Sequence, residues 1–196
     1  MFGSWFYSLS SDSPEEAGAF GEMIVNNTMK LKKYQDIECY LFKDVYIDGP
    51  DRVNQIDHIF ILKTGIFVVE TKMFSNGKVN GTDNDEMWFY NKKPFLNPII
   101  QNESHVRALR KLIGDSFNII PLVVFAWNNK PKTCKNQHVL NYSEFIDYPL
   151  NYIPDKELSS DDMKHICYLL TENEKIKPEL KLKHREQLKK AKGKRR

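Results

Sequence analysis

Two acidic residues and a lysine, Asp57, Glu70 and Lys72, interrupt or end hydrophobic segments of the chain. A charge in such a segment is costly unless it is paired or coordinates a metal. Carboxylate oxygens are the ligands that Mg²⁺ and Mn²⁺ prefer, and water and substrate phosphate complete the shell. A cation held by the two acids could activate water and neutralise the charge that develops on a phosphodiester. Lys72 could orient the attacking water or stabilise the transition state, so these residue types favour metal-dependent phosphodiester hydrolysis.

The three side chains can converge because their segments are typical of neighbouring strands. Residues 53–62 and 66–72 are predicted strands, and the short connection between them predicts a hairpin. Side chains alternate between the faces of a strand, so Glu70 and Lys72 point the same way, one pleat apart. Across such a hairpin, Asp57 falls close to opposite one of them. The alternative is that this Glu-x-Lys is an exposed ion pair, which would stabilise the protein little.

The surrounding sequence predicts further elements around this hairpin. We expect helices at 14–34, 97–114 and 160–170, strands at 39–47, 119–127 and 138–140, and a small hairpin formed by 77–81 and 87–90. The continuous apolar run at 66–69 indicates a central strand that is buried on both faces. The order of elements predicts an α/β fold of three layers, in which a mixed central sheet is flanked by helices.

Positive charge is concentrated at the end of the chain. Residues 175–196 hold 11 of the 29 Lys and Arg but only two of the 26 acids, which leaves 18 bases and 24 acids in residues 1–174. We therefore expect one domain over 1–174 and a basic C-terminal tail over 175–196. A tail of this kind is attracted to polyanions, with an affinity that falls as salt rises. The predicted nucleic-acid-binding residues are Lys189, Lys190, Lys192, Lys194, Arg195 and Arg196. The alternative is a solvated helix end or a disordered, solubilising tail.

Cysteine usage and hydropathy bear on the compartment. Cys39, Cys134 and Cys167 are widely spaced and form no CxxC pair. This pattern indicates reduced thiols, so we expect a cytoplasmic location. No apolar run approaches the roughly 20 residues that span a bilayer, and stable membrane insertion of this chain is not expected.

Four ordered segments resemble the nuclease-related domain (NERD) family over about residues 15–130. They are Gly21-Glu22, Gln55-Ile56-Asp57-His58, Gly65 to Lys72, and Asn97-Pro98 through Gln101 to His105. That family is placed in the PD-(D/E)xK restriction-endonuclease-like superfamily, whose core is αβββαβ. This implied core agrees with the order of elements predicted from the residues.

The resemblance also implies roles for individual residues. Asp57 and Glu70 would be metal ligands, the backbone carbonyl of Thr71 a further ligand, and Lys72 the catalytic lysine. Glu22 would complete the site from the first helix, and Gln101 would approach the substrate or the lysine from the second. The proline that usually precedes the first acid is replaced by Ile56.

The implied activity is Mg²⁺- or Mn²⁺-dependent hydrolysis of DNA in DNA processing or repair, with RNA a less favoured substrate. Backbone contacts carry no base information, so low sequence specificity is expected. A non-catalytic nucleic-acid-binding or assembly module that keeps the fold is the alternative. A homodimer would bring two sites together, but no residue pattern requires one.

Two histidines near these residues have open roles. His58 follows Asp57 and points to the opposite face of the sheet, which indicates a structural role. His105 lies four residues after Gln101 and shares its helix face, where it would contact substrate or remain near solvent.

Overall fold

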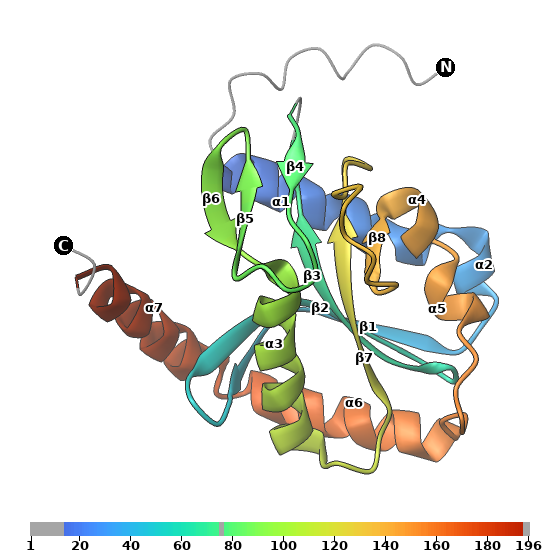
Figure 1. Ribbon diagram of the computed structural model, residues 1–196. Coiled ribbons are helices and arrows are strands. Elements are labelled where there is room, and N and C mark those ends of the chain that lie inside the picture. Colours follow the sequence, from blue (N-terminus) through green and yellow to red (C-terminus); the bar gives the residue numbers. More distant parts are fainter. Residues whose placement is uncertain (1–13, 75–76, 194–196) are drawn as a thin grey trace.

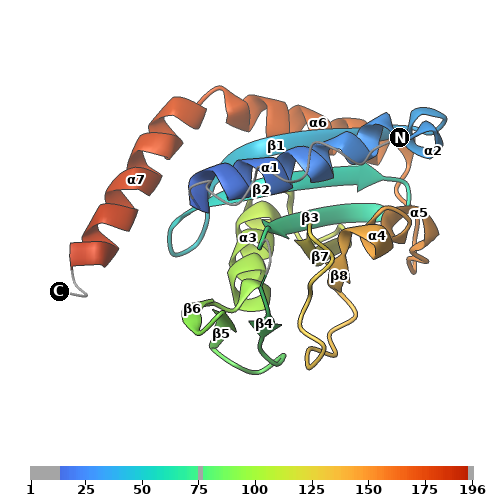
Figure 2. The same cartoon turned by 90° about the horizontal axis from the view of Figure 1, so that it is seen from above.

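A mixed five-stranded sheet organises the chain, and helices pack on both of its faces (Figures 1 and 2). The structure is a computed structural model that describes residues 14–74 and 77–193. The helices are α1 (Pro14–Asn26), η2 (Asn27–Lys30), α2 (Lys32–Gln35), α3 (Pro98–Ile113), α4 (Tyr142–Phe145), α5 (Tyr148–Asn151), α6 (Ser160–Glu174) and α7 (Lys177–Gly193). The strands are β1 (Cys39–Asp48), β2 (Val53–Leu62), β3 (Gly65–Lys72), β4 (Val79–Asn80), β5 (Met87–Tyr90), β6 (Lys93–Leu96), β7 (Ile119–Phe125) and β8 (Val139–Asn141).

The main sheet has the strand order β1-β2-β3-β7-β8. Short turns make β1, β2 and β3 antiparallel neighbours, whereas β7 and β8 run parallel to β3. A parallel neighbour needs a crossover, and α3 supplies it between β3 and β7. The elements α1, β1, β2, β3, α3 and β7 therefore form the expected αβββαβ core, and the predicted mixed sheet is confirmed.

Each face of the sheet carries its own core. Ile59, Ile61 and Val68 pack against residues of α3 and α6, whereas Phe60 and Phe67 face the layer that contains α1, α2 and α4. Side chains that alternate along β2 and β3 thus fill two separate layers, which confirms the predicted three-layer fold.

A second sheet of three short strands, β4-β5-β6, is inserted between β3 and α3. Trp88 on β5 is fully buried, and its ring stacks on Phe125 of β7 with centroids 6.2 Å apart. The sequence predicted the first two strands of this sheet but not β6.

The first helix is shorter than expected. The prediction of one helix to Tyr34 is wrong, because α1 ends at Asn26 and Leu31 is extended before α2 begins. Asn26, Asn27 and Thr28 explain the break, since side chains of these types compete with the helix for backbone hydrogen bonds. The short helices α4 and α5 were not predicted, and α6 continues four residues beyond its expected end at 170.

Residues 177–193 of the basic segment form α7, which packs on β1 and β2 (Figure 1). Leu180 is buried in a small cluster with Tyr46 and Val53. In the structure, α7 packs on the same sheet as the other helices. The division of the chain into a domain over 1–174 and a tail over 175–196 stays a prediction. Across 14–74 and 77–193, none of the helices has the length and apolar character needed to cross a bilayer.

Candidate active site

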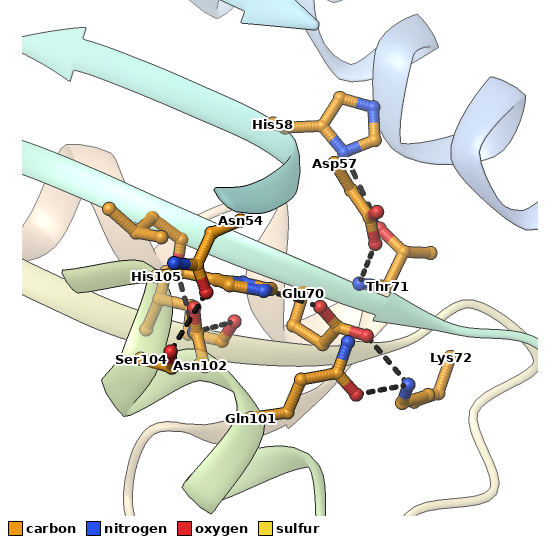
Figure 3. A network of polar contacts seen from close by, with 12 residues as sticks. Asn54, Asp57, His58, Glu70, Thr71, Lys72, Gln101, Asn102, Ser104 and His105 are labelled. Atoms are coloured by element: carbon orange, nitrogen blue, oxygen red, sulfur yellow. Dashed lines mark hydrogen bonds and ion pairs between the residues drawn. The ribbon is translucent and has the colours of Figure 1, made fainter. Parts of the chain in front are cut away.

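The strands β2 and β3 separate at one end, and the predicted acids lie at this fork (Figure 3). Their ladder runs from Leu62↔Gly65 to His58↔Val69 and does not continue to Asp57 and Glu70. Beyond the last pair, Asp57 Oδ2 accepts a hydrogen bond from the backbone N–H of Thr71 at 2.8 Å. The Thr71 N–H is thus bonded to the Asp57 carboxylate rather than to a backbone carbonyl of β2. This hydrogen bond holds Asp57 beside the end of β3.

Glu70, Lys72 and Gln101 meet at the same place (Figure 3). Lys72 Nζ donates to Glu70 Oε1 at 2.6 Å and to Gln101 Oε1 at 3.1 Å. Glu70 is 3% exposed, so this pair is not the exposed ion pair considered above. The prediction that Glu70 and Lys72 point the same way is confirmed.

A cleft of about 390 Å³ opens onto these residues. Asp57, Glu70 and Gln101 line it together with Glu22 of α1. Burial, and next the negative charge of Glu70, raise the pKa of Asp57 well above its usual range. Burial also raises the pKa of Glu22, with the charges of Asp44 and Glu70 adding to the effect. The cleft thus concentrates negative charge that a cation would relieve.

Two buried polar atoms at the base of the cleft lack hydrogen-bond partners among the described residues. They are Glu70 Oε2 and His105 Nδ1, which lie 3.5 Å apart without hydrogen-bond geometry. Burial lowers the pKa of His105 although Glu70 opposes the shift, so the ring is held neutral. A buried oxygen without a donor is available to a metal ion or a substrate group.

These residues fit a divalent cation that keeps much of its water. Within 14–74 and 77–193, no group of three His, Cys, Asp or Glu side chains is arranged to enclose a metal. Mg²⁺ binds through one or two carboxylates and completes its octahedral shell with water and phosphate. Asp57 and Glu70 match that donor set, whereas the role of the Thr71 carbonyl stays a prediction.

The comparisons with known proteins agree with this geometry. The family model described as nuclease-related domain matches residues 17–126, which is more than half of the chain. The chain belongs to the NERD family. A Bacillus anthracis protein, described only as uncharacterized, is 30% identical to this NERD protein over 181 residues, which cover 87% of this chain and 83% of that protein. No solved structure was found to match the chain.

Buried amides place the helix α3 of this NERD domain. Asn102 Nδ2 donates to the carbonyls of Val68 and Leu122, both at 2.9 Å, and so ties α3 to two parallel strands. Ser104 donates to Asn54 Oδ1 at 2.8 Å. This anchoring directs Gln101 into the cleft. Sequence reasoning missed Asn102, although an amide on the apolar face of a helix is a signal that it binds backbone groups.

His58 ties α1 to the fork from the other face of the sheet. Its Nε2 lies 3.1 Å from Asn26 Oδ1, and its Nδ1 lies 3.4 Å from Thr71 Oγ1. The ring is fully buried. The predicted structural role of His58 is confirmed, and its partners belong to the segments that carry Glu22 and the end of β3.

Gly21 allows α1 to approach the end of β3, and this contact can be tested by substitution. A Cβ at position 21 would lie 2.7 Å from Met73 Cβ, so Gly21→Ala must displace the helix. We expect a loss of about 1 kcal/mol of unfolding free energy, because overpacking outweighs the gain in helix propensity. The free energies of unfolding of the wild type and Gly21→Ala can be compared by urea denaturation followed by circular dichroism.

The matched control lies one turn earlier. A Cβ at Gly18 would meet no atom within 4 Å, so Gly18→Ala should stabilise the protein by about 0.5–1 kcal/mol. Equal stability of the two variants would show that α1 does not depend on this close approach.

The structure brings only part of the basic tail near the cleft. His184 and Leu188 of α7 line the cleft together with Arg52 from the turn between β1 and β2. Lys189 and Lys190 are exposed on α7, whereas the side chain of Lys192 and all of residues 194–196 lie outside the described part of the chain. Sequence reasoning missed Arg52 and His184, since the packing of α7 on β2 joins residues more than 130 positions apart.

Proposed function

We propose that this NERD protein is a metal-dependent nuclease that hydrolyses phosphodiester bonds in DNA with Mg²⁺ or Mn²⁺. The observation that supports it is the convergence of Asp57, Glu70 and Lys72 where β2 and β3 part, with a buried Glu70 oxygen that has no hydrogen-bond partner among the described residues. Family membership supports a nuclease-related function, and the chemistry of the carboxylates favours a hard cation.

In the proposed reaction water adds to the phosphorus and one P–O ester bond breaks. A divalent cation, when bound, would neutralise charge on the phosphate and acidify water. Asp57 and Glu70 would hold it, Asp57 being oriented by the Thr71 amide. Glu70 and Gln101 fix the ammonium of Lys72, which would hold the attacking water or an equatorial phosphate oxygen. Glu22 lines the same cleft and would accept a proton or orient a water there.

Lys189 and Lys190, in the last turns of α7, would add affinity for the DNA backbone. Both are exposed, whereas Lys181 and Lys183 are already paired with Asp44 and Asp48. Lys189 and Lys190 can therefore neutralise phosphates without losing an existing ion pair. Such contacts are independent of sequence and weaken with salt, so low sequence specificity belongs to the proposal.

Supercoiled plasmid incubated with Mn²⁺ tests this function. We expect nicking by the wild type and a loss of at least about 10²-fold in Glu70→Gln and Lys72→Met, because each removes several kcal/mol of transition-state stabilisation. Matched controls are Glu157→Gln and Lys63→Met, an exposed pair with Nζ and Oε1 3.4 Å apart that is not among the residues lining the cleft. Equal nicking by the wild type and all four variants would remove these residues from the reaction.

One observation favours the alternative of a non-catalytic binding module, namely that the described residues contain no group of three His, Cys, Asp or Glu side chains arranged around a metal. The same experiment separates the two functions when duplex, single-stranded and branched DNA and matched RNA are all offered. Binding without cleavage of any of them would favour the module, and faster cleavage of RNA would change the proposed substrate.

A further inference from the structure

Arg52 and His184 line the cleft beside the acids Glu22, Asp57 and Glu70. Within the described ranges, no carboxylate forms an ion pair with either of them. By contrast, Lys181 and Lys183 of α7, the helix that carries His184, form ion pairs with Asp44 and Asp48. The described residues therefore supply no carboxylate to the Arg52 guanidinium or to the ring of His184.

The backbone that carries Arg52 is held firmly. Its carbonyl accepts the N–H of Gly49 at 2.9 Å and the side-chain amide of Asn54 at 3.0 Å. A Cβ at Gly49 would lie 2.9 Å from that carbonyl and 2.6 Å from the Asn54 amide, so this tight turn depends on glycine. A guanidinium presented from such a turn loses little backbone entropy when it binds an anion.

Contacts with β2 and β1 fix the ring of His184. Its Nδ1 lies 3.0 Å from the carbonyl of Val53 and therefore carries a hydrogen. Gln187, one turn on, accepts the N–H of the same Val53 at 3.1 Å, and Tyr46 holds the ring edge-on with centroids 5.7 Å apart. These contacts leave Nε2 as the nitrogen available to a ligand in the cleft, where a protonated ring would donate.

Arg52 and His184 line the same cleft as the acids Glu22, Asp57 and Glu70. A polyanion that approaches Glu22, Asp57 and Glu70 would be repelled by them wherever no metal ion intervenes. Cations beside the acids offset that repulsion for the phosphates that flank the reacting one.

We propose that Arg52 and His184 bind the phosphodiester adjacent to the scissile one, so that α7 forms part of the substrate site. The inference rests on the proposed function and names the second phosphate contact of that site. A guanidinium binds two phosphate oxygens at once, and the His184 ring, when protonated, supplies a third donor through Nε2. Leu188, one turn beyond His184, lines the same cleft and offers an apolar contact for the intervening sugar.

Two conservative variants test the pair. Arg52→Gln removes the charge, and His184→Asn keeps a donor for the Val53 carbonyl while it removes Nε2. Arg185→Gln is the matched control, because Arg185 is exposed on α7 and does not line the cleft. Binding of a labelled single-stranded oligonucleotide is measured by fluorescence anisotropy in EDTA, where no hydrolysis interferes. Cleavage is then measured on oligonucleotides that carry one uncharged methylphosphonate at successive positions from the cut.

We expect about tenfold weaker binding for each cleft variant, as for the loss of one charge-assisted hydrogen bond, and less than about twofold for Arg185→Gln. In the cleavage experiment KM should rise while kcat changes little. For the wild type, a methylphosphonate beside the cut should lower kcat/KM about as much as Arg52→Gln does on the unmodified oligonucleotide. For Arg52→Gln, the same methylphosphonate should cause little further loss of kcat/KM. The assignment would be overturned if Arg52→Gln and Arg185→Gln weakened binding equally, or if the wild type did not bind. It would also be overturned if the methylphosphonate and Arg52→Gln lowered kcat/KM additively. If the wild type binds but does not cleave, the proposed function fails and the anisotropy comparison still decides the role of the pair.

Discussion

Asp57→Asn is expected to stabilise the metal-free protein while it abolishes metal-dependent cleavage. The amide keeps an oxygen for the Thr71 N–H but removes a partly buried charge that lies close to Glu70. We expect a gain of at least about 1 kcal/mol in the free energy of unfolding in EDTA at neutral pH. Nicking of plasmid with Mn²⁺ should fall by at least about 10²-fold, and the stabilisation by added Mn²⁺ should be lost.

The sign of the pH dependence distinguishes this effect from a change in packing. Asp57 has a higher pKa in the folded protein than its ordinary value of 3.8, so the folded state binds a proton more readily than the unfolded state. The destabilisation therefore grows as the pH rises from about 3.8 through the folded pKa and is complete above it. The advantage of Asp57→Asn should accordingly disappear below pH 3.8.

Chemical denaturation in EDTA at several pH values measures this difference. The control is Asp115→Asn, whose carboxylate is 89% exposed and should change stability by less than about 0.5 kcal/mol. A variant no more stable than the wild type, or one whose advantage is independent of pH, would show that Asp57 is not destabilised by its surroundings.

His58→Gln is expected to remove a large part of the acid sensitivity of the fold. Burial lowers the pKa of His58 from 6.5 to about 4, with the charge of Lys43 adding to the effect. The neutral ring stabilises the folded state fully above pH 6.5, and this contribution is lost as the pH falls from 6.5 to about 4. The shift corresponds to about 3 kcal/mol, and glutamine keeps a donor for Asn26 without titrating in this range.

The difference in unfolding free energy between wild type and variant should therefore shrink by up to about 3 kcal/mol between pH 7 and pH 4. Comparison of the two proteins at each pH cancels the opposite dependence that Asp57 contributes. His165→Gln on the exposed surface of α6 should keep the slope of the wild type. If His58→Gln retains that slope as well, the ring is not held neutral by burial.

The part of the site that the sequence predicted depends on local pairing. Asp57, Glu70 and Lys72 lie on two strands joined by a tight turn, so alternation and hairpin register place them together within sixteen positions of the chain. Asn97 caps α3 by accepting the N–H of Ile99 at 2.9 Å, as the Asn-Pro start predicted. Glu22 and Gln101 needed the family resemblance, because periodicity alone does not distinguish them from solvated helix residues.

The parts that could not be predicted depend on distant partners. Asn102 is buried because carbonyls of β3 and β7 accept its two hydrogens. His184 reaches the cleft because Val53, 131 positions earlier, offers its carbonyl. Ile100 of α3 is apolar and is nevertheless 39% exposed. Periodicity reports which face is apolar but not which backbone groups a polar side chain will meet.

The fork between β2 and β3 has a consequence for the handling of fragments. Where the strands part, the start of β2 lacks β3 as a partner, and Gln187 and His184 cover the backbone groups of Val53 instead. A fragment that stops at 174, or at the family boundary of 126, would uncover this strand edge together with the apolar surface of Tyr46 and Val53. Unpaired edges are templates for intermolecular β-pairing. We therefore expect such fragments to aggregate on expression, whereas the full chain stays monodisperse.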